Sequence, residues 1–189
     1  MDKRQFLLTS AAALGLGAVS LTGCTTTPMS REDGRSKHQK IDAGVDDTLQ
    51  RLYSTVPDSR TLVGKANGVL VFPSVVAAGF VVGGEYGEGA LRVGGRTVDY
   101  YSTVSGSFGL QIGAQSKAII FLFMTQEALD KFRNSNGWTA GVDASVAVLR
   151  AGANGALNTA PQPVNVIVMT NQGLMANLNV EGTKITKLK

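Results

Sequence analysis

Hydrophobic residues recur every three or four positions between residues 41 and 56, which predicts an amphipathic helix. The apolar face carries Ile41, Val45, Leu49, Leu52, Tyr53 and Val56. Aspartates occupy the opposite face, and Pro57 ends the helix because the residue before a proline disfavours the helical conformation. Residues 58–66 predict a short second helix, with Asp58 or Ser59 as its N-cap.

The rest of the chain has the pattern of short strands. The run GVLVFP predicts a strand that stops at Pro73, and residues 78–124 read as further strands broken by glycines. Residues 125–134 predict one inserted helix with Thr125 as its cap, and strands return from Trp138 onward. Helices that lie only at the start and in one insertion predict an α+β fold. We expect an antiparallel β-sheet that curls toward a partial barrel.

The stretch AAGFVVGGEYGEGALRV, residues 77–93, is rich in glycine and could belong to a phosphate-binding loop or to a sheet. A phosphate-binding loop needs its glycines to open a helix, so that free N–H groups meet the anion. Here the following GALRV is strand-like, and Glu85 and Glu88 would repel phosphate. The pattern therefore favours a bend or hairpin in which backbones pack closely.

The first residues are typical of an export signal. A basic MDKR precedes the short apolar run QFLLTSAAALGLGAVS and the tetrapeptide LTGC, which ends at Cys24. LTGC resembles the bacterial lipobox, in which the signal is cut before a cysteine that then carries a diacylglyceryl group. We therefore expect residues 1–23 to be a lipoprotein signal peptide and Cys24, the only cysteine, to be acylated, with palmitate among its chains. Export through the Sec or the twin-arginine route stays open.

This interpretation divides the chain into three parts. The signal peptide is followed by residues 24–40, the lipidated cysteine and a polar, flexible tether, and then by one domain, residues 41–189. Thr25 stands where inner-membrane retention signals carry aspartate, which favours the outer membrane of a Gram-negative cell. Whether the domain faces the periplasm or the cell surface stays open. Membrane lipid, through acylated Cys24, is the expected partner.

Composition excludes several functions. The formal net charge is only +4 and aromatic residues make up 6%, so nucleic-acid binding is not expected. The single histidine, His38, falls in the predicted tether, and no cysteine remains free after acylation. We expect no catalytic residues, no metal and no cofactor. A carboxylate pair of Glu85 and Glu88, as in a glycosidase, is the one hydrolase hypothesis that the residues suggest.

Three segments resemble the SYLF domain family, also called the fungal actin-regulator domain family. They are ANGVLVFPSVVAAGFVVGGEYGEGAL at residues 66–91, YYSTVSGSFGLQIGAQSKAIIFLFMTQEALDKFRNSNGW at residues 100–138, and GVDASVAV at residues 141–148. Eukaryotic members bind phosphoinositide-containing membranes, and some bind actin. Bacterial members resembling this chain are exported, often as lipoproteins. The resemblance implies a lipid-binding module, while actin is not expected in a bacterial envelope.

The resemblance also implies contact with anionic phospholipid headgroups. The basic residues in the matching region are Arg60, Lys65, Arg92, Arg96 and Lys117. The helix over residues 41–56 carries aspartates on its polar face, so we expect it to pack on the sheet. The leading interpretation is a non-catalytic envelope lipoprotein that binds phospholipid or another apolar ligand. The alternative is a structural protein of the envelope that contacts a protein partner or peptidoglycan.

Overall fold

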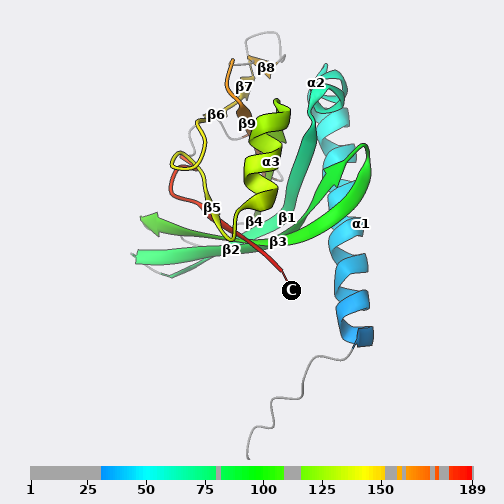
Figure 1. Ribbon diagram of the computed structural model, residues 1–189, viewed down its shortest axis with the longest axis vertical. Helices are drawn as coiled ribbons and strands as arrows, with labels where there is room; N and C mark the ends of the chain where they lie inside the picture. Colours follow the sequence, from blue (N-terminus) through cyan, green and yellow to red (C-terminus); the bar gives the residue numbers. More distant parts are fainter. Residues whose placement is uncertain are drawn as a thin grey trace, which may run out of the picture.

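The computed structural model describes residues 31–79, 82–108, 116–151, 157–158, 161–170, 173–174 and 179–188. The predicted signal peptide, Cys24 and the first part of the predicted tether lie outside the described residues. Helices α1 (Arg31–Thr55) and α2 (Ser59–Lys65) precede the strands, and α3 (Gln126–Asn134) is inserted between them (Figure 1). Among the described helices, none has the length and apolar character needed to cross a bilayer.

A single large sheet dominates the described structure. Its strands follow the order β10 (Gly173–Leu174), β9 (Val164–Thr170), β4 (Ser116–Phe123), β1 (Gly68–Gly79), β2 (Val82–Val93), β3 (Arg96–Phe108), β11 (Lys184–Lys187) and β5 (Trp138–Thr139). Neighbours along this path are antiparallel, and β6 (Val146–Val148) adds a parallel pairing to β9. Strands β7 (Arg150–Ala151) and β8 (Leu157–Asn158) form a separate pair. The long strands β2 and β3 bend strongly (Figure 1), so the predicted α+β fold with a curled sheet is confirmed.

The sheet buries a hydrophobic core on each face. Helix α1 covers one face, where its apolar residues meet those of β1, β4 and β9. Helix α3 covers the other face, where Phe121, Phe123, Phe132 and Trp138 pack edge to face or tilted. Because strand side chains alternate between faces, consecutive residues of β4 enter different cores.

The predicted tether is wrong in its second half, because α1 begins at Arg31 and residues 31–40 are helical. Tertiary contacts hold these polar turns. The Nζ of Lys37 lies 2.6 Å from Oε1 of Glu88, and the ring of His38 stacks on that of Tyr100. Two acidic residues in the first turn also suit the helix dipole. Sequence periodicity missed these turns because polar contacts, not an apolar stripe, attach them to the sheet.

Helix α2 begins where the sequence predicted it to begin, but its first turn is not held by a capping side chain. Asp58 stands at the N-cap of α2 with a φ of 63°, and its side chain makes no cap hydrogen bond. The buried Ser59 hydroxyl instead donates to the carbonyl oxygen of Val56 at 2.8 Å. This bond fixes the turn after Pro57, so α2 folds back beside the end of α1.

Strand β1 does not stop at Pro73, contrary to the prediction. It runs to Gly79, and its pairing with β2 shifts register between Val71 and Ser74. A bulge accommodates proline because the ladder hydrogen bonds are interrupted there. Pro73 also contacts α1, where a Cβ built on Gly44 would lie 3.1 Å from the proline ring.

The glycine-rich stretch lies in the sheet, as the sequence pattern favoured. Its described residues form the end of β1 and all of β2, and strand β3 follows. A Cβ on Gly87 would lie 2.8 Å from the carbonyl oxygen of Ser74, and one on Gly89 would overlap the carbonyl of Val71. These two glycines are therefore required by the close approach of backbones and not by a ligand.

Candidate functional site

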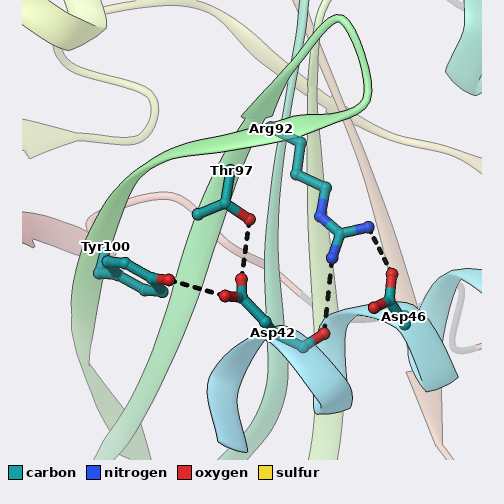
Figure 2. Close-up of polar contacts among 5 residues, drawn as sticks. All are labelled: Asp42, Asp46, Arg92, Thr97 and Tyr100. Atoms are coloured by element: carbon teal, nitrogen blue, oxygen red, sulfur yellow. Dashed lines mark hydrogen bonds and ion pairs between the residues drawn. The ribbon is translucent and has the colours of Figure 1, made fainter. Parts of the chain in front are cut away.

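Asp42 connects α1 to strand β3. The hydroxyls of Thr97 and Tyr100 each donate a hydrogen bond to its carboxylate, both at 2.7 Å (Figure 2). Burial and the hydrogen bond to Asp42 raise the pKa of Tyr100 to about 12. The phenol therefore stays a neutral donor at ordinary pH, and the helix is held to the sheet by an uninterrupted pair of charge-assisted bonds.

Arg92, from strand β2, makes the second connection to the same helix. Its Nη1 lies 2.5 Å from Oδ1 of Asp46, and its Nη2 donates to the backbone oxygen of Asp42 at 3.5 Å (Figure 2). The side chain is 16% exposed, and its Nε is buried without a hydrogen-bond partner in the described structure. Arg92 thus retains one unsatisfied donor beside the helix.

A cavity of about 670 Å³ adjoins this network. Its walls come from α1, α2, the start of β1 and the β2–β3 turn, and it is lined by Asp46, Leu49, Gln50, Tyr53, Arg60, Val63, Gly64, Ala66, Val69, Arg92, Gly94 and Gly95. Gly94 and Gly95 have φ values of 58° and 79° and form the two-residue turn between β2 and β3. The cavity therefore combines an apolar wall with two arginines.

Arg60 projects from α2 at the edge of this cavity. Its guanidinium carbon lies 4.3 Å from the centroid of the Tyr53 ring, an arrangement typical of a cation–π contact. No carboxylate of the described residues pairs with Arg60. Burial raises the pKa of Tyr53, while the charges of Arg60 and Arg92 act in the opposite direction. The tyrosine therefore orients an arginine whose charge is available to an anion.

The five basic residues selected from the sequence are not gathered in one place. Arg60 and Arg92 line the same cavity. Lys65 is the exposed last residue of α2, outside the cavity lining, and Arg96 follows the turn, paired with Val93. Lys117 lies on the opposite face of the sheet, where its Nζ is 2.7 Å from Oε1 of Glu85 and both side chains are about nine-tenths buried.

Glu85 and Glu88 do not form a carboxylate pair. They are three residues apart on β2, so their side chains point to opposite faces. Glu85 accepts hydrogen bonds from Lys117 and Ser105. Burial acts to raise the pKa of Glu88, but hydrogen bonds with Lys37 and Tyr86 outweigh it and lower the pKa below its ordinary value. The geometry that a glycosidase needs is not made by these two residues.

Reasoning from the sequence missed Tyr53 and Asp42 as members of a site. Tyr53 was assigned to the apolar face of the helix, and Asp42 to its solvated face. The four-residue spacing of Asp42 and Asp46 was the available signal, since it places both carboxylates on one side of the helix. In the part of the chain that is described, no group of three or more His, Cys, Asp or Glu residues could hold a metal ion.

The second half of the chain matches a known protein family. Residues 104–189 match the Ysc84 family, described as Las17-binding protein actin regulator. No curated protein gives a significant match to the chain. The SYLF resemblance expected from the sequence is confirmed over residues 104–189. The matched domain implies a lipid-binding or actin-regulator-related role. The cavity residues precede the matched segment, so the match itself says nothing of their function.

Proposed function

We propose that this protein is a non-catalytic, membrane-anchored lipoprotein of the bacterial envelope whose SYLF domain binds the headgroup of an anionic phospholipid. The observation that carries the proposal is the cavity between α1 and α2, where Arg60 and Arg92 meet an apolar wall. The outer membrane of a Gram-negative cell is the proposed location, in line with LTGC and Thr25.

The chemistry of the cavity suits a phosphodiester. Guanidinium groups bind phosphate oxygens through charge-assisted hydrogen bonds, and Arg60 has no carboxylate partner among the described residues. Arg92 contributes less charge because Asp46 already pairs with it. Leu49, Val63 and Val69 provide an apolar wall for the glycerol and the first methylenes of a lipid.

The proposed anchor would hold the domain near its ligand. Acyl chains on Cys24 contribute about 0.8 kcal/mol for each buried methylene, so a multiply acylated protein stays on its membrane. Seven residue steps separate Cys24 from Arg31, where α1 begins, a span of at most about 24 Å. The domain would therefore meet headgroups at a high local concentration.

A titration of the full-length protein in neutral detergent tests headgroup binding. The probes are dihexanoyl phosphatidylglycerol, dihexanoyl phosphatidylcholine and inorganic phosphate, followed by calorimetry. We expect the anionic lipid to bind best and Arg60→Ala to weaken it about tenfold or more, the cost of one charge-assisted bond. Arg133→Ala removes the same charge from α3 on the other face and should bind as the unaltered protein does. The proposal is contradicted if Arg60→Ala and Arg133→Ala bind dihexanoyl phosphatidylglycerol with equal affinity. It is also contradicted if the unaltered protein does not bind this lipid.

A further inference from the structure

Three exposed hydrophobic side chains form a row across the sheet. Val76, Tyr86 and Val104 are 41%, 51% and 51% exposed. They are direct neighbours in register, since Val76 pairs with Tyr86 and Tyr86 pairs with Val104. Side chains that pair directly lie on the same face of a sheet. We call these three residues the apolar row.

The apolar row lies on the face of the sheet that α1 partly covers. Even-numbered residues of β2 point to this face, as Arg92 and Glu88 show by their contacts with α1. Farther along the strands, Gly84 pairs with Gly106, and a Cβ on Gly106 would meet nothing within 4 Å. Among the described residues, the surface beside the apolar row is therefore open at Gly106.

The apolar row is linked to the first third of α1. The hydroxyl of Tyr86 donates to Oε1 of Glu88 at 2.6 Å, and Lys37 pairs with the same oxygen at 2.6 Å. The first turns of α1 extend past the strands (Figure 1). The six residue steps from Arg31 to Lys37 span about 9 Å along the helix. With the seven steps back to Cys24, the proposed acyl anchor lies within about 33 Å of the Lys37 backbone, whose side chain pairs with Glu88 beside the row.

We propose that the apolar row rests on the surface of the bilayer that holds the anchor. This inference depends on the proposed lipidation of Cys24. Valine side chains enter the region of the headgroups, and a tyrosine ring suits it because one end is apolar and the other is polar. Lys184 pairs in register with Val104 at one end of the row, and Ser116 pairs with Val76 at the other. The flanking cation suits an anionic membrane, and the carboxylate that accepts from Tyr86, that of Glu88, is paired with Lys37.

Single-cysteine labelling tests this orientation on the acylated, full-length protein. Because Cys24 would be blocked, a new cysteine is the one site for a thiol-reactive, environment-sensitive fluorophore. The variants are Val76→Cys and Val104→Cys, with Val142→Cys, 78% exposed in the turn after β5, as the control. The protein is placed in phosphatidylglycerol–phosphatidylcholine vesicles with or without doxyl-labelled lipid. We expect doxyl lipid to quench the label at both row positions several-fold more than at Val142.

The outcomes separate this inference from the proposed function. If the protein floats with the vesicles but labels at the row are quenched no more than the control, the row does not face the bilayer and the inference fails alone. Emission that depends on protein density and not on doxyl lipid would show a second copy on the row and would also overturn the inference. If mass spectrometry shows an unmodified Cys24, the anchor and the proposed function fail together.

Discussion

The ring of His38 stacks on the ring of Tyr100, with centroids 3.8 Å apart and planes inclined by 5°. This contact joins the early turns of α1 to the middle of β3. It explains why residues with no apolar stripe are helical, since an isolated polar helix of this length would be marginal in water. The first ten residues of α1 therefore depend on the sheet for their order.

Removing the imidazole should loosen the start of α1. We expect His38→Ala to weaken the docking of residues 31–40 by about 1 kcal/mol, the contribution of an aromatic pair. Amide hydrogen exchange should rise several-fold in this segment and stay unchanged in β4. Gln39→Ala, an exposed neighbour, is the control. Equal exchange in the two variants would show that the stack does not hold the helix.

Loss of the Asp42 carboxylate should destabilise the whole domain. Asp42→Ala leaves the hydroxyls of Thr97 and Tyr100 without their acceptor. We expect a loss of about 2 kcal/mol in the free energy of unfolding, measured by urea denaturation. Asp47→Ala changes the same charge at an exposed position of α1 and should cost far less. A similar loss in both variants would mean that helix charge, and not the hydrogen bonds, matters.

Tyrosine ionisation should be delayed in the folded protein. A hydrogen bond to Glu88 raises the pKa of Tyr86, and burial raises the pKa of Tyr100 and Tyr101, each to about 12. Folded-state values above the ordinary 10.0 add stability that is fully present below pH 10.0 and is lost as pH rises toward about 12. Phenolate absorbance should therefore rise at higher pH in buffer than in urea. Superimposable curves would refute this.

Two glycine substitutions should differ sharply. Gly89→Ala would place a methyl group against the carbonyl of Val71 in the neighbouring strand. The two strands cannot move apart there without breaking hydrogen bonds of the β1–β2 ladder. We therefore expect the free energy of unfolding to fall by about 3 kcal/mol or more. Gly106→Ala meets nothing within 4 Å and should change stability by less than about 1 kcal/mol. Thermal unfolding of both variants measures the difference, and comparable melting temperatures would refute the steric argument.

Cys24→Ser should abolish lipid attachment. We expect mass spectrometry of the unaltered protein from its host to find a chain that begins at an acylated Cys24, and the variant to keep its N-terminal segment without acyl groups. In cells that make the Cys24→Ser variant, the membrane fraction should contain no chain that begins at residue 24. A matched Thr25→Ser variant, next to the proposed cleavage site, should be processed normally. If the masses of the variant and the unaltered chain differ only by the Cys-to-Ser substitution, acylation is refuted.

Local patterns in the sequence determined a large part of this protein. Helical spacing from Ile41, the stop at Pro57 and the cap at Thr125 depend on neighbouring residues, and the structure confirms each of them. The side chain of Thr125 accepts a hydrogen bond from the amide of Ala128 at 3.2 Å, as a capping residue should. Acylation at Cys24 stays a prediction, because it depends on a segment outside the described residues.

Only the tertiary structure decided what the charged residues do. Arg60 and Arg92 are 32 positions apart, and they share a cavity because α2 folds back beside the β2–β3 turn. Lys117 has the same charge, yet it is buried against Glu85 on the opposite face. A sequence pattern records spacing along one element, whereas a binding site depends on distances between elements. Those distances are set by how the helices pack on a curled sheet.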